Sequence, residues 1–220
     1  MPINKKYLAE FCNNKFYHIY NRTNNRELLF REEKNYHFFL KQFARYLSEL
    51  VEIHAWALLP NHFHFLIKVK DAAQIRQFIL KKDPVVRTHA EQLFLDTDNT
   101  DLLTISAFKR FFTSYAMAFN KVYHRKGNLF ARTFKRKEIH NNDQYNKTLL
   151  YIHLNPLKHK LINDFKDYEW TSYNRILYKS PGFLQKKEVL RSFGNRKIFM
   201  ADHYLTARYF FNASAEKNNQ

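Results

Sequence analysis

Two apolar runs separated by only two residues constrain the fold of this chain more than any other feature of its sequence. The runs are VEIHAWALL at 51–59 and HFHFLIKVK at 62–70, and both have the composition of strands. Pro60–Asn61 between them is a turn signal. Because a two-residue connection of this kind is typical of hairpins, the sequence predicts an antiparallel β-hairpin.

The rest of the chain alternates between strand-like and helix-like patterns. We predict a strand over 16–22, a helix over 33–50, a helix over 106–124, a basic strand within 129–140, and a helix from Asn142 or Asp143 to about Asn155, which Pro156 ends. Together with the hairpin, this order is typical of an α+β fold. An antiparallel sheet with helices on one face, as in ferredoxin-like and RRM-like domains, accommodates it.

Two segments lie outside this pattern. The acidic stretch 71–102 contains Asp83–Pro84 and DTDNTD at 96–101, so we expect an insertion with one or two short helices. Residues 179–220 are expected to form a small, mostly helical C-terminal appendage and tail. Residues 1–178 would then make up the main domain.

The charge of the chain points to a polyanionic partner, with nucleic acid as the first hypothesis. The 37 Lys and Arg residues exceed the 20 Asp and Glu residues by 17, an imbalance larger than solubility alone requires. Six cations within 103–140 are candidates for DNA binding: Arg125, Lys126, Arg132, Lys135, Arg136 and Lys137. They are interleaved with Phe130 and Phe134, which suits phosphate contact combined with base stacking. A solvated basic face beside core aromatics is the alternative explanation.

Composition also excludes several kinds of site. With only three glycines, the chain has no glycine-rich phosphate-binding loop. The single cysteine, Cys12, cannot form an internal disulfide or a Cys-based zinc site, which fits a reducing compartment. The sequence has no run of 18 apolar residues and no signal-peptide pattern near its start. We therefore expect a cytoplasmic protein that does not enter the membrane.

His62 and His64 are candidate metal ligands. A spacing of two on a strand sends both imidazoles to one face, and Phe63 and Phe65 to the other. Two neutral imidazoles can bind one divalent ion, whose charge polarises a phosphate oxygen. A metal needs more than two ligands, however, and two histidines with structural roles are the more common explanation of this spacing.

The helix that follows Asp143 offers the missing groups. Tyr151 and Asn155 are neighbours one turn apart on its polar side. A phenol at this place can be a nucleophile, and the amide oxygen of Asn155 can be a third metal ligand. Because the chain has 14 tyrosines, most of which must serve in packing, spacing alone does not select Tyr151. Lys147, one turn before Tyr151, is expected to be a solvated helix lysine.

Four blocks in a fixed order add a family resemblance. AWALLPNHFHFLIKV, GNLFARTFKRKEI, YIHLNPLKHKL and EWTSY closely resemble the signature blocks of single-tyrosine transposases of the HUH superfamily, above all the REP-associated tyrosine transposases. YHIYNR at 17–22 is similar to the first strand of that family. The resemblance runs from about Phe16 to Tyr178 and implies an HUH nuclease fold.

The resemblance also implies a function and a role for each candidate residue. His62 and His64 would bind Mg²⁺ or Mn²⁺, Asn155 would complete the metal site, and Tyr151 would be the nucleophile. The protein would then be a bacterial transposase that cleaves and rejoins single-stranded or hairpin DNA through a 5′-phosphotyrosine link. Such proteins act as monomers or homodimers, and the sequence does not choose between the two.

Two other functions compete with this one. A nucleic-acid-binding regulator derived from a transposase would bind DNA without cutting it. A metal-dependent hydrolase would cut DNA with an activated water, but the sequence lacks an Asp or Glu cluster around His62 and His64. A covalent protein–DNA adduct is expected only for the transposase.

Overall fold

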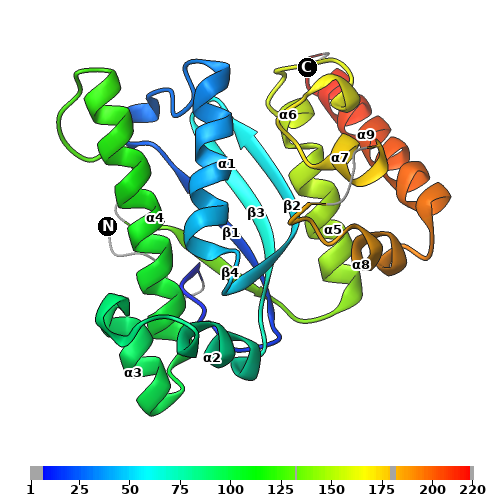
Figure 1. The fold of residues 1–220 in the computed structure, drawn as a ribbon. Helices are drawn as coiled ribbons and strands as arrows, with labels where there is room; N and C mark the ends of the chain where they lie inside the picture. Colours follow the sequence, from blue (N-terminus) through cyan, green and yellow to red (C-terminus); the bar gives the residue numbers. More distant parts are fainter. Residues whose placement is uncertain (1–6, 132, 179–181, 219–220) are drawn as a thin grey trace.

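The computed structural model describes residues 7–131, 133–178 and 182–218, with side chains as far as residue 209 (Figure 1). The strands are β1 (Phe16–Arg22), β2 (Val51–Leu59), β3 (His62–Val69) and β4 (Lys135–Ile139). The α-helices are α1 (Glu33–Leu47), α2 (Ala72–Leu80), α3 (His89–Thr97), α4 (Thr100–Val122), α5 (Asn142–His153), α6 (Asn155–Lys158), α7 (Tyr173–Tyr178), α8 (Lys186–Ser192) and α9 (Arg196–Asn218). Short 3₁₀ turns cover Asn24–Arg26, Pro84–Val86 and Phe165–Asp167.

The four strands form one antiparallel sheet in the order β2-β3-β1-β4. Strands β2 and β3 pair as the predicted hairpin, with Leu59 opposite His62 across the Pro60–Asn61 turn. With α1 between β1 and β2, and α4 between β3 and β4, this is the strand order of a ferredoxin-like domain. The predicted α+β fold is confirmed.

An aromatic core lies between one face of the sheet and helices α1 and α4. Because side chains alternate along β3, Phe63 and Phe65 both point to this face. Phe39 and Phe43 of α1 meet them, and the ring centroids of Phe43 and Phe65 are 4.3 Å apart. Phe111 of α4 packs against Phe39 at 4.9 Å. All five rings are fully buried, so this layer fixes the register of β3.

Helix α5 covers the opposite face of the sheet, which the predicted one-sided arrangement left open. It contacts β2 and β3, and Figure 1 shows it with α6 to α9 on the other side of the sheet from α1 and α4. Tyr145, Leu149 and Ile152 form its buried stripe. Because this apolar stripe needs a surface to cover it, α5 packs on the face of β3 to which His62 and His64 point.

Two element boundaries differ from the sequence prediction. Helix α4 begins at Thr100, six residues before the predicted start, because the Asn99 side chain accepts from the backbone N–H of Leu102 and caps it. Strand β4 is confined to Lys135–Ile139 within the basic run. Residues 71–102 contain α2 and α3, which lie at one end of α4 in Figure 1. None of the helices in the described part of the chain has the length and apolar character that crossing a membrane requires.

A buried chain of hydrogen bonds ties the C-terminal helices to α5. His203 Nδ1 donates to the carbonyl of Phe199 at 2.7 Å, so its Nε2 accepts from Nδ1 of His153 at 2.8 Å. His153 Nε2 in turn accepts from the Ser172 hydroxyl at 2.6 Å, and that oxygen accepts from the backbone N–H of Trp56 at 2.9 Å. This pattern requires both histidines to be neutral, because each ring then has one N–H donor and one acceptor nitrogen. The chain joins α9, α5 and β2.

We expect these two histidines to make the protein sensitive to acid. Burial lowers the pKa of His203 to about 4 and the pKa of His153 well below the usual 6.5. The unfolded chain therefore binds protons that the folded chain does not. Their stabilising contribution is complete above about pH 6.5 and is lost as the pH falls toward 4. Urea denaturation over this range should show a flatter pH dependence for His203→Leu than for the parent. The exposed control His37→Leu should keep the parent slope, and an unchanged slope for His203→Leu would refute the explanation.

Candidate nucleic-acid processing site

The four residues that the sequence singled out for chemistry lie together under α5, three of them lining a pocket and Asn155 buried beside His62. His62 and His64 reach it from β3, with ring centroids 5.3 Å apart. Tyr151 lies on α5, and its ring centroid is 5.6 Å from that of His64. Asn155 begins α6, directly after the last turn of α5. The strand alternation and the one-turn spacing that predicted these placements are both present in the structure.

The atoms around His62 suit a divalent cation. Nδ1 of His62 lies 2.7 Å from Oδ1 of Asn61, and because an amide oxygen only accepts, Nδ1 carries the ring proton. Nε2 is then unprotonated, and its lone pair faces Oδ1 of Asn155 at 3.4 Å. Two acceptors this close repel each other unless a cation lies between them. Two ligands of one ion are typically about 3.0–3.4 Å apart, as these atoms are.

The buried amide of Asn155 supports the same interpretation. Asn155 is fully buried, and its Nδ2 has no hydrogen-bond partner among the described residues. The opposite amide orientation would let Nδ2 donate to His62, so the observed one leaves a nitrogen unsatisfied, at a typical cost of about 1–3 kcal/mol. A cation bound to the amide oxygen would favour the observed orientation.

Burial keeps the imidazoles in the form that binds metals. It lowers the pKa of His62 to about 4, with the neighbouring His159 as a smaller cause. It also lowers the pKa of His64 well below 6.5, with smaller contributions from His18 and His62. Both rings are therefore neutral at pH 7, as metal ligation requires. The donor set of two imidazoles and one amide oxygen fits a divalent cation with further positions open to substrate.

A lysine that the sequence did not indicate lies beside Tyr151. Nζ of Lys158, at the end of α6, is 4.9 Å from the ring centroid of Tyr151. Lys147 instead forms an exposed ion pair with Asp143 at 2.8 Å, as expected of a solvated helix lysine. Of these two lysines, Lys158 is therefore the one that lies near the ring of Tyr151.

Two further histidines join the site from elsewhere in the fold. His18 of β1 lies with its Nε2 2.9 Å from Nδ1 of His64. His159 lies with its ring centroid 4.9 Å from that of His62. The only sequence signal for His18 is its spacing: it lies two residues before Tyr20 on a predicted strand, as His62 lies two residues before His64. His159 has no signal beyond its place after the Asn155–Pro156 pair.

The site opens into a cavity of about 820 Å³. Its walls include the imidazoles of His62 and His64 and the ring of Tyr151. The cations Arg22, Arg26 and Lys135 also line it. None of the described residues that line it is acidic. A concave wall with one sign of charge attracts the opposite sign, so the cavity suits a phosphodiester backbone.

Two of the six predicted DNA-binding cations have partners inside the protein. Arg125 forms a bidentate ion pair with Glu27, with N–O distances of 2.6 and 2.8 Å. Arg136 is buried and donates from Nε to the carbonyl oxygen of Ala9 at 2.6 Å. These contacts stabilise the fold, and they connect segments that are about a hundred residues apart in the chain.

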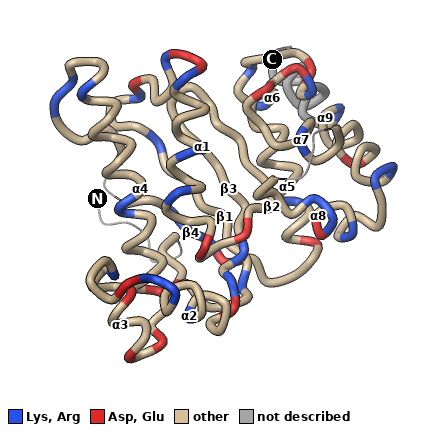
Figure 2. The backbone as a smooth tube through the Cα atoms, in the orientation of Figure 1, with Lys and Arg blue, Asp and Glu red and all other residues tan. Residues whose placement is uncertain are grey.

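The other predicted cations are divided between the surface and the cavity. Lys126 and Lys137 are exposed, Lys135 lines the cavity, and Arg132 lies outside the described residues. Figure 2 shows Lys and Arg along the loop after α4 and on α8, with Asp and Glu gathered around α3. Lys and Arg therefore also occur outside the 103–140 segment, on α8.

A second group of candidate metal ligands lies where β2 meets α8. Glu52, His54 and Glu188 each offer an atom within 4.8 Å of the others, the one such group of His, Cys, Asp and Glu in the described chain. His54 is fully buried, and its Nε2 has no partner among the described residues. The ammonium of Lys68, however, lies 3.9 Å from Glu52 and 3.7 Å from Glu188. This triad can hold a divalent ion only if Lys68 moves aside.

Comparison with known proteins shows a likeness of fold. No protein-family model and no curated protein matches the sequence. Among solved structures, the chain is similar to a REP-associated tyrosine transposase bound to a REP hairpin, with a TM-score of 0.53 and 17% sequence identity. The match covers 80% of this chain and 84% of that one. The chain therefore shares the fold of that structure, and its function must be argued from the site.

The internal ion pair gives a testable distinction between structural and surface cations. We expect Arg125→Ala to lower the free energy of unfolding by about 1–3 kcal/mol, because it leaves the partly buried Glu27 carboxylate without its bidentate partner. The adjacent exposed Lys126→Ala should change it by less than about 0.5 kcal/mol. Urea denaturation measures both, and equal effects would show that the ion pair contributes no stability.

Proposed function

We propose that the protein is a metal-dependent tyrosine transposase of the REP-associated type, which cleaves and rejoins single-stranded or hairpin DNA. The observation that carries the proposal is the shared pocket, where Tyr151 lies against His64 while His62 faces Asn155. The fold likeness to a transposase bound to a REP hairpin supports it. The basic wall of the cavity, which has no acidic residue among the described ones that line it, supports a nucleic-acid substrate.

His62, His64 and Asn155 would hold the cation, Mg²⁺ or Mn²⁺. When bound, it would polarise a phosphate oxygen and stabilise the departing alkoxide. The protein contributes a rigid frame, because both histidines lie on a central strand and Asn155 is buried at the start of α6. Holding the reacting groups in place in this way supplies a large part of catalysis.

Tyr151 would attack the phosphodiester through its hydroxyl oxygen. A bond forms between that oxygen and phosphorus, and the bond between phosphorus and the 3′ oxygen breaks. The phenolic proton passes to solvent, and the leaving 3′ oxygen takes up a proton to become a free 3′-OH. Lys158 beside the ring would stabilise the phenolate that this step requires. The 5′-phosphotyrosine link retains the bond energy, so the 3′-OH of another strand can displace Tyr151 and rejoin the DNA.

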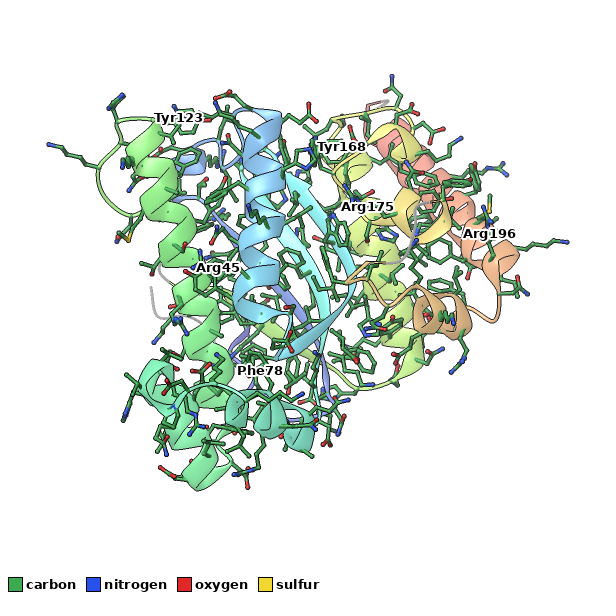
Figure 3. All side chains as sticks on the ribbon, viewed as in Figure 1. Arg45, Phe78, Tyr123, Tyr168, Arg175 and Arg196 are labelled. Atoms are coloured by element: carbon green, nitrogen blue, oxygen red, sulfur yellow. The ribbon has the colours of Figure 1, made fainter. Side chains whose placement is uncertain are left out.

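A covalent adduct tests the nucleophile. A hairpin oligonucleotide incubated with the protein and Mn²⁺ should yield a protein–DNA adduct that migrates as one band on a denaturing gel. Tyr151→Phe should abolish the adduct, because it removes only the attacking oxygen. The matched control is Tyr123→Phe at the end of α4, whose hydroxyl bonds to Glu32 and Asn35 far from α5 (Figure 3). An adduct that persists in Tyr151→Phe would refute the assignment.

The histidine variants separate cutting from binding. His62→Ala and His64→Ala should each lose cleavage but keep most of their DNA affinity, since backbone contacts supply the binding. Gel-shift titration and adduct formation on the same preparation measure both. DNA binding by the parent protein without any adduct would favour the non-cleaving regulator, and cleavage without an adduct would favour the hydrolase.

The salt dependence of DNA affinity tests the role of β4. Lys135→Ala and Lys137→Ala should each reduce the slope of log affinity against log salt by about 0.7, if each lysine neutralises one phosphate of a single strand. Lys147→Ala is the control, because this exposed lysine is paired with Asp143 on α5. A parent-like slope for both β4 variants would exclude this strand from the DNA-binding surface.

A further inference from the structure

The contact between His18 and His64 carries information about which ring nitrogen can bind a metal. Nε2 of His18 and Nδ1 of His64 are 2.9 Å apart, the distance of a hydrogen bond. We infer that His18 is a positioning residue, which holds His64 in the tautomer that leaves Nε2 of His64 free for a divalent cation. The inference rests on the proposed function and assigns a role to a residue outside the HFH sequence.

The positions of the protons on the two rings lead to this role. One proton lies between the two nitrogens, because two neutral imidazoles share one donor and one acceptor in a hydrogen bond. If His18 donates, His64 keeps its remaining proton on Nε2 and cannot ligate a metal there. If His64 donates from Nδ1, its Nε2 is a lone pair. Only the second arrangement makes His64 a ligand through Nε2, and it requires His18 to be the acceptor.

His62 is held in the same way by a different residue. Its Nδ1 donates to Oδ1 of Asn61, which leaves its Nε2 as a lone pair toward Asn155. A metal-ligating histidine almost always donates its other N–H to such a partner, which fixes the tautomer and the orientation of the ring. His18 would therefore do for His64 what Asn61 does for His62.

The surroundings of His18 hold its ring in place. It lies on β1, which is hydrogen-bonded on both sides, to β3 and to β4. Its ring stacks on that of Tyr20 with a centroid distance of 4.8 Å. Lys137 lies directly opposite on β4. A ring held in place in this way is a suitable partner for a ligand that must not rotate.

Metal affinity tests the role without relying on activity. Mn²⁺ is titrated into the full chain without DNA, and free Mn²⁺ is measured by electron paramagnetic resonance. His18→Phe keeps a ring but has no acceptor, and we expect it to weaken Mn²⁺ binding by about 10–100-fold, as loss of such a partner typically does. His18→Gln, whose amide oxygen can reach the place of Nε2, should restore most of the affinity. Parent-like affinity in His18→Phe, or equal losses in both variants, would overturn the inference.

His62→Ala separates this inference from the proposed function. If His62→Ala loses Mn²⁺ and His18→Phe does not, the metal site stands and only the role of His18 fails. If His62→Ala binds Mn²⁺ as the parent does, both the metal site and the role of His18 fail. Thermal unfolding of each metal-free variant shows whether it is folded.

The tautomer of His64 can also be observed directly. Long-range ¹H–¹⁵N correlation spectra of the histidine rings distinguish a proton on Nδ1 from one on Nε2. In the metal-free parent we expect His64 to carry its proton on Nδ1. In His18→Phe a mixture of tautomers should appear, and in His18→Gln the parent form should return. A proton on Nε2 of His64 in the parent would overturn the inference.

Discussion

The alternation of side chains along β3 is the constraint on which both the core and the site depend. Phe63 and Phe65 point into the aromatic layer beneath α1 and α4, and this burial fixes the register of the strand. The same register places His62 and His64 under α5. A shift of one residue would exchange the two sets, placing imidazoles in the core and phenyl rings in the cavity. The stability of the fold and the geometry of the site are therefore set by the same pairing.

Electrostatics divides the polar residues into two classes. Around the cavity, neutral imidazoles lie among cations, and the wall has no acidic residue among those described. At the junction of β2 and α8, by contrast, Glu52 and Glu188 face Lys68. A phosphate is attracted to the first environment and gains nothing from the second. This difference favours the cavity beside His62 and His64 as the place where DNA would react.

Patterns of short range were predictable from the sequence, and contacts between distant segments were not. The hairpin, the shared face of His62 and His64, and the one-turn spacing of Tyr151 and Asn155 follow from periodicity. The ion pair of Arg125 does not, because its partner Glu27 is 98 residues away. The role inferred for His18 likewise depends on the pairing of β1 with β3, which no local pattern specifies. The resemblance of four ordered blocks supplied the roles that spacing left open.

Mapping the residue that carries DNA tests the central claim most directly. The adduct formed with a hairpin oligonucleotide and Mn²⁺ would be digested with nuclease and protease, and the modified peptide sequenced by mass spectrometry. We predict a nucleotide attached through its 5′ phosphate to Tyr151. A nucleotide on any other residue, or strand cleavage that leaves no nucleotide on the protein, would contradict the account.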